Sequence, residues 1–247
     1  MFVAFTTASG LFDNAFNKIA CAATGNLNGF CHVEVGCNTT VGDLIDLKSR
    51  LGANRNDRMF ATLSELLEAY PLSTPRKEPV VLAFHAFYGS PLGVRILSPH
   101  CPDPLYQPYN EENWKVYNFA GASESIVRAQ TAWCLSKVGD PYDTFGALLS
   151  PMRSFHKAPG AVEPDPESWW CSAHSLRFIQ HLGMLNNCSL RGCTPNNLEV
   201  KLCSYKDTNP SQGSSQRKLD LGSEHWGVIN NVIQKVVPPR LRSGKRD

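Results

Sequence analysis

The sequence predicts an α+β fold in which an antiparallel sheet packs against a helix that starts at Cys171. Three stretches support this prediction. Residues 30–37 alternate in side-chain character as a strand does. An apolar run at 80–87, opened by Pro79, is followed, after a turn, by a short strand at 93–97, which is typical of a β-hairpin. Residues 172–182 place apolar side chains at helical spacing, and a glycine then ends the helix.

Length and charge set the organisation of the chain. Its 247 residues, 42% hydrophobic and 19% charged, suit one globular domain with an appendage. We expect the domain at 1–205 and a linker with a basic C-terminal extension at 206–247. A net charge of +2 is too mild for a protein that binds nucleic acid over its whole surface. Residues 235–247 carry five basic side chains against one acidic one, which permits a weak nucleic-acid or protein contact.

The cysteine content points to a reducing compartment, and the apolar pattern to a chain without a membrane segment. No run of 18 apolar residues predicts a transmembrane segment, and the N-terminus lacks the order of a signal peptide. Nine scattered cysteines favour reduced thiols, hence a cytoplasmic location, although Cys188 and Cys193 can pair in an oxidising setting. No cysteine pair has the CxxC spacing of a zinc site, so we predict neither metal nor cofactor.

Residues 2–5 predict a strand and residues 11–23 a helix, before the strand at 30–37. Alternation along that strand divides its side chains into a face with Cys31, Val33 and Val35 and a face with Phe30, His32 and Glu34. Residues two apart on one face lie about 6.5 Å apart at the backbone, so the Glu34 carboxylate can approach the His32 imidazole. The alternative is an ordinary solvated strand face.

The middle of the chain contains helical and central-strand patterns. Residues 39–79 predict a helix-bearing excursion with proline stops. The run at 80–87 is apolar on both faces and therefore central in its sheet. Its one polar residue, His85, should face the neighbouring strand. A helix is expected from Ala122 or Ser123 through Leu135, with an inward face made of Ile126, Ala129, Ala132 and Trp133.

Cys171 lies where a thiol becomes reactive. Prolines keep the preceding segment extended, so Cys171 falls at the N-terminus of its helix. There the backbone amides and the helix dipole favour a thiolate and can hold an oxyanion. A buried structural cysteine is the alternative. His174 and His181 lie on the same helix, with His174 expected at an exposed or capping position, and the proline-rich loop 154–167 can act as a flap.

These patterns together resemble the permuted papain-like amidases of the YaeF/YiiX type, relatives of the NlpC-type cell-wall peptidases. The likeness spans about residues 1–202. It is carried by residues 31–35, Gly93-Val94-Arg95, Gly139 with Pro141-Tyr142-Asp143, and Trp170-Cys171-Ser172. The resemblance implies a circularly permuted papain-like fold.

In that family the helix cysteine is the nucleophile and the strand histidine its base, so these roles fall to Cys171 and His32. A third polar residue on the following strand orients the imidazole, and His85 matches that position. Glu34 is the alternative, because a carboxylate stabilises an imidazolium better than a second histidine does. Both residues stay open as the orienting group.

The resemblance implies a thiol hydrolase that cleaves an amide, isopeptide or related acyl bond in a peptide or acylated substrate. One alternative is a lipid acyltransferase or thioesterase with the same Cys-His dyad, since similar permuted folds include the lecithin-retinol acyltransferases. Another is a non-enzymatic structural or virion protein, because relatives also occur in large DNA viruses. That alternative would place the chain in the host cytoplasm or the virion.

Overall fold

The computed structural model describes residues 1–7, 29–52, 57–98, 101, 106–109, 113–119, 121–151 and 165–208, together with residues 15, 18 and 19. These residues fall into two compact units. The first contains the described residues of 1–37, 84–94 and 109–208, and the second those of 38–83 and 95–108. Most of the predicted helix at 11–23, the flap up to residue 164 and the chain beyond 208 lie outside the described residues.

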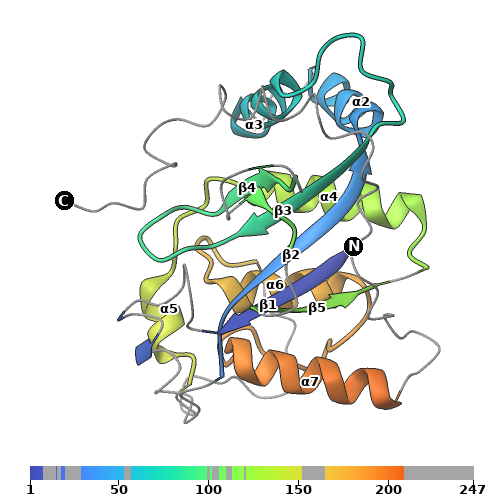
Figure 1. Cartoon of the computed structure of the whole chain (residues 1–247). Helices are drawn as coiled ribbons and strands as arrows, with labels where there is room; N and C mark the ends of the chain where they lie inside the picture. The colour runs from blue at the N-terminus through green and yellow to red at the C-terminus, as the bar shows by residue number, and fades with distance from the viewer. Residues whose placement is uncertain are drawn as a thin grey trace. The chain divides into compact units, whose positions relative to one another are not determined.

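The strands form a five-stranded sheet in the order β4-β3-β2-β1-β5 (Figure 1). Their bounds are Phe2–Thr7 for β1, Phe30–Thr40 for β2, Pro79–His85 for β3, Gly93–Ile96 for β4 and Trp114–Asn118 for β5. Strand β1 pairs antiparallel with both β2 and β5. The predicted α+β class is confirmed, and so is the pairing of β3 with β4. Residues 80–84 of β3 are buried, as expected of a strand with a neighbour on each side.

A register shift interrupts the pairing of β2 with β1. Thr6 pairs with His32, but Thr7 pairs with Phe30, so Cys31 is an extra residue on β2. Such a bulge breaks the alternation of side chains along the strand. Phe30 accordingly packs its ring against a phenylalanine of β1, at a centroid distance of 5.5 Å.

The bulge also moves Cys31. Its side chain packs against Phe87 and Trp114, and the same two rings contact the imidazole of His32. The prediction that Cys31 lies on the face opposite His32 is therefore wrong. The reason is that alternation holds only for a regularly paired strand, and the pairing with β1 is irregular at this point.

Four helices of the first unit follow the sheet strands in sequence. Their bounds are Glu124–Lys137 for α4, Thr144–Leu149 for α5, Cys171–His181 for α6 and Pro195–Thr208 for α7. Helix α6 contacts both α4 and α7. The predicted starts of α4 and α6 are confirmed to within a residue or two. Shortly after α6, Gly183 has a φ of 80°, the left-handed conformation that glycine adopts readily.

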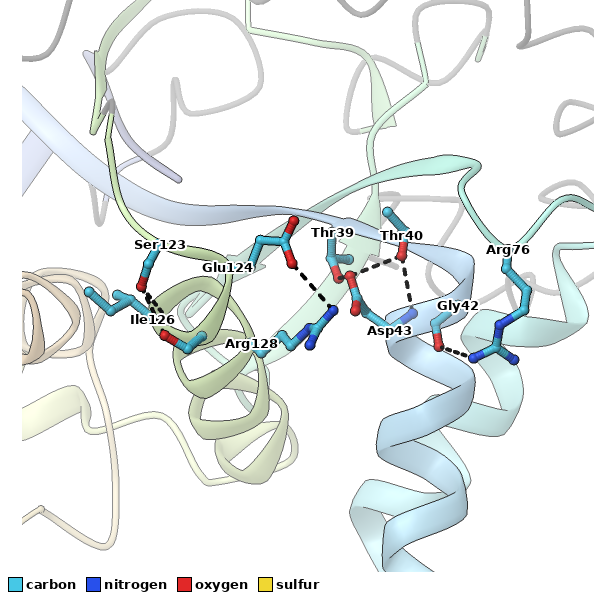
Figure 2. Close-up of polar contacts among 10 residues, drawn as sticks. Thr39, Thr40, Gly42, Asp43, Arg76, Ser123, Glu124, Ile126 and Arg128 are labelled. Atoms are coloured by element: carbon cyan, nitrogen blue, oxygen red, sulfur yellow. Dashed lines mark hydrogen bonds and ion pairs between the residues drawn. The ribbon is translucent and has the colours of Figure 1, made fainter.

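Helix α4 turns a partly polar face inward. Ser123 caps the helix by accepting from the Ile126 amide, and Glu124 pairs with Arg128 one turn on (Figure 2). The buried side chains are Gln130, Thr131, Cys134 and Leu135. The predicted inward face is wrong at Ile126, which is 43% exposed, and at Ala129. Two of these polar side chains donate hydrogen bonds there: Gln130 Nε2 to the Phe178 carbonyl and the Thr131 hydroxyl to the Val127 carbonyl.

The second unit contains α2 (Val41–Leu51) and α3 (Asp57–Glu68), in agreement with the predicted helical excursion. Thr40 caps α2: its hydroxyl accepts from the Asp43 amide and donates to the Asp43 carboxylate (Figure 2). Arg76 is joined to Gly42 through both backbone and side chain. None of the described helices is both long and apolar enough to cross a membrane.

Candidate active site

Cys171 is the first residue of α6, as predicted. The segment before it is held by backbone hydrogen bonds. The Trp169 amide donates to the Pro141 carbonyl at 2.9 Å, and the Asp143 amide donates to the Trp169 carbonyl at 3.0 Å. These bonds form a parallel bridge between Trp169 and Tyr142. The start of α6 is therefore fixed by a segment about 30 residues earlier in the chain.

The residues on either side of Cys171 are tied to one carbonyl. The oxygen of Cys193 accepts from Trp170 Nε1 at 3.0 Å and from Ser172 Oγ at 2.7 Å. The Cys171 side chain is 7% exposed. The first amides of a helix have no acceptor within that helix, and the positive end of the dipole lies there. The fixed first turn thus presents backbone N–H groups beside the thiol.

His32 and Glu34 share a face of β2, as the alternation predicted. His32 Nε2 lies 3.2 Å from Glu34 Oε1, and both residues are buried. The imidazole stacks on Phe87 at a centroid distance of 4.8 Å and meets the edge of Trp114 at 6.4 Å. The prediction of an ordinary solvated strand face does not fit a carboxylate with no exposed surface.

The Cys171 thiol and the Glu34 carboxylate both act on the imidazole of His32. Burial acts to lower the pKa of His32, but the hydrogen bonds and negative charges of Cys171 and Glu34 outweigh burial and raise the pKa to about 9. Because Nε2 faces Glu34, the other ring nitrogen is left for the thiol. The raised pKa keeps the His32 imidazole protonated at neutral pH.

Tyr109 completes the surroundings of the carboxylate. Its hydroxyl donates to Glu34 Oε2 at 2.5 Å, so each oxygen of Glu34 has a hydrogen-bond partner. Nothing in the sequence pointed to Tyr109. It lies 75 residues from Glu34, in a loop rich in proline and tyrosine whose spacing has no periodic signal.

His32 is hydrogen-bonded to Glu34 and interacts with the Cys171 thiol. No family model, curated protein or solved structure matches this protein. Among the described residues, no group of three or more His, Cys, Asp or Glu side chains is arranged to hold a metal ion. The chemistry of these side chains is nucleophilic and acid–base, and it is the basis for a functional proposal.

His85, the other predicted orienting residue, lies at the end of β3. Its ring packs against Phe87 at a centroid distance of 4.4 Å, so Phe87 contacts both imidazoles. The imidazole also lies over Gly93 of β4, where an added Cβ would be 2.5 Å from its Cε1 atom. His85 thus faces the neighbouring strand as predicted. The hydrogen bond of the His32 imidazole is made with Glu34 rather than with His85.

Tyr142 lies near the thiol, held there by its bridge with Trp169. Burial, followed by the negative charges of Cys171 and Asp143, raises the pKa of Tyr142 well above its ordinary value. Its phenol therefore stays protonated through the physiological range. In the sequence it was part of the motif that carried the family resemblance, without a role of its own.

His174 does not take the exposed or capping position that we predicted. It is 1% exposed, stacked on Trp133 at 5.1 Å and set against the edge of Trp169. Burial, with the positive charge of Lys137, lowers the pKa of His174 to about 3. The prediction failed because α6 is buried on nearly every side. His174 is therefore a neutral core residue.

Proposed function

We propose that this protein is a cysteine-dependent hydrolase that cleaves an amide, isopeptide or related acyl bond. Cys171 is the nucleophile, His32 its base, and Glu34 the residue that orients His32. The observation that carries the proposal is the buried His32–Glu34 contact of 3.2 Å, joined to a thiol at a helix N-terminus. We also propose that the sheet and α6 belong to the permuted papain-like architecture that the sequence resembles.

The reaction follows from the order of the three side chains. Cys171 gives its proton to His32, and the sulfur attacks the acyl carbon. The amides of the first turn of α6 stabilise the oxyanion that forms. When the bond to the leaving group breaks, His32 returns the proton to that group and a thioester remains on Cys171. Water then loses a proton to His32, attacks the thioester and releases the acid and the thiol.

Glu34 supports both proton transfers. Its charge stabilises the imidazolium that exists while His32 holds the proton, and its hydrogen bond to Nε2 directs the other ring nitrogen toward the thiol. The eight cysteines that the structure describes are all free thiols, which is compatible with the reducing compartment that we propose for the protein.

An acylation assay tests the proposal. The protein is treated with p-nitrophenyl acetate, the burst of p-nitrophenol is measured, and the acylated cysteine is located by mass spectrometry. We expect a thioester at Cys171 that is lost in Cys171→Ser and in His32→Ala. Cys188→Ser, which removes a partly exposed thiol, is the matched control and should keep the burst. Equal acylation of Cys171 in wild type and His32→Ala would show that the dyad does not exist.

The fate of the thioester separates hydrolysis from acyl transfer. Hydrolysis predicts that the Cys171 thioester decays in water at a rate that added glycinamide does not change. A decay that accelerates with glycinamide, with the acetyl group recovered on the amine, would instead favour transfer to an acceptor.

A further inference from the structure

The Glu34 carboxylate is fully buried and its two oxygens face different partners. Oε1 contacts His32, and Oε2 accepts from the Tyr109 hydroxyl. A buried carboxylate is stable as an anion only when its oxygens are hydrogen-bonded. Tyr109 therefore supplies a hydrogen bond to the oxygen that does not face His32.

We propose that Tyr109 is a positioning residue that holds Glu34 in the orientation and charge state that His32 requires. This inference rests on the proposed function and adds Tyr109 to its three residues through the hydrogen bonds from Tyr109 to Glu34 and between Glu34 and His32. Tyr109 does not touch the reacting atoms. It acts through Glu34, because a carboxylate fixed at one oxygen presents the other at a fixed angle.

The Tyr109 ring is itself fixed by the sheet. It meets Phe2 of β1 edge-on at a centroid distance of 5.5 Å and packs on Trp114 of β5 at 4.4 Å. Trp114 in turn meets the edge of the His32 ring. The phenol is thus locked by aromatic packing on two strands, and its hydroxyl needs no rearrangement to reach Glu34.

Loss of the Tyr109 hydroxyl should lower the pKa of His32. Without the donor, the buried Oε2 loses a hydrogen bond and the charged carboxylate becomes less stable. Glu34 then either takes up a proton or turns away from His32. In both cases His32 loses the negative charge that helps to keep its pKa high. The imidazolium should therefore lose its proton at a lower pH.

Tyr109→Phe removes the hydroxyl and keeps the ring between Phe2 and Trp114. The matched control is Tyr70→Phe, because the Tyr70 hydroxyl is buried with no hydrogen-bond partner among the described residues. Two quantities are measured: the His32 titration midpoint by NMR and the pH dependence of Cys171 acylation. Thermal unfolding confirms that each variant is folded.

We expect Tyr109→Phe to lower the His32 midpoint, to move the alkaline limb of acylation to lower pH and to slow acylation about tenfold. Tyr70→Phe should change none of these. In a Glu34→Gln background, Tyr109→Phe should have no further effect on the midpoint, because its partner is already uncharged.

Two results would overturn the inference in distinguishable ways. If wild type acylates at Cys171 but Tyr109→Phe leaves the His32 midpoint and the alkaline limb in place, Tyr109 has no positioning role and the proposed function stands. If Tyr109→Phe lowers the midpoint equally with Glu34 and with Gln at position 34, Tyr109 does not act through Glu34. Absence of Cys171 acylation in wild type would remove the proposed function, and with it the role of Tyr109.

Discussion

His32 Nε2 lies 3.2 Å from Oε1 of Glu34, two residues further along the same strand. The contact joins a side chain that can carry a proton to one that stabilises the positive charge, and both are removed from water. Because the two residues are two apart on one strand, strand geometry places both side chains on the same face. It leaves the other imidazole nitrogen available to a thiol brought from 139 residues away.

Replacing Glu34 should have a larger effect than replacing His85. Glu34→Gln keeps the shape of the side chain but removes the charge beside His32, and we expect acylation of Cys171 to slow by about 10²-fold. His85→Asn alters a residue that contacts His32 through the ring of Phe87, so we expect less than about a tenfold loss. The acylation burst measures both. A larger loss in His85→Asn would make His85 the orienting residue.

The His32 ion pairs should stabilise the protein in a pH-dependent way. The pKa of His32 is raised to about 9 from an ordinary 6.5. Its contribution to the free energy of unfolding is therefore complete below pH 6.5 and is lost as the pH rises through about 9. The stability difference between wild type and His32→Gln should shrink by on the order of 3 kcal/mol across this window. Urea unfolding at pH 6 and pH 10 measures it, and equal differences at both would contradict the raised pKa.

His174 should make the protein less stable as the pH falls below 6.5. Its pKa is lowered to about 3, so the unfolded chain binds a proton near pH 6.5 and the folded protein does not. Stability from this residue is complete above pH 6.5 and declines toward pH 3, by about 1.4 kcal/mol per pH unit. His174→Phe keeps a ring beside Trp133 without the titration. We expect a shallower acid loss of unfolding free energy in this variant, and an unchanged slope would show that His174 is protonated in the folded state.

The position of the Phe2 ring should require a glycine at position 36. The two residues pair across β1 and β2, and a Cβ at Gly36 would lie 1.9 Å from Phe2 Cζ. Gly36→Ala must displace a fully buried ring, and we expect a loss of about 1–3 kcal/mol in the free energy of unfolding. The control is Gly52→Ala, at a helical position where the nearest atom is the Ser49 carbonyl oxygen at 3.3 Å. Chemical denaturation should show a larger loss of unfolding free energy for Gly36→Ala than for Gly52→Ala. Equal losses would contradict the explanation by contact with Phe2.

The parts of the candidate site that could be predicted from the sequence depend on local geometry. The side-chain period of a strand placed His32 and Glu34 on one face, and helical spacing with a glycine stop placed Cys171 at a helix start. The apolar run at β3 indicated a central strand for the same reason. These rules need only a few consecutive residues, so they hold without knowledge of the rest of the fold.

Contacts between distant segments of the chain decided the features of the site and the fold that could not be predicted from the sequence. Tyr109 reaches Glu34 only because a loop between β4 and β5 packs its ring on two strands, and no spacing in the sequence indicates that path. Pairing with β1 produced the bulge that turned Cys31 toward the rings around His32. Hydrogen bonds across the core allowed polar side chains of α4 to be buried. Each outcome depends on which partner a side chain meets, and that partner is set by tertiary packing rather than by neighbours in the sequence.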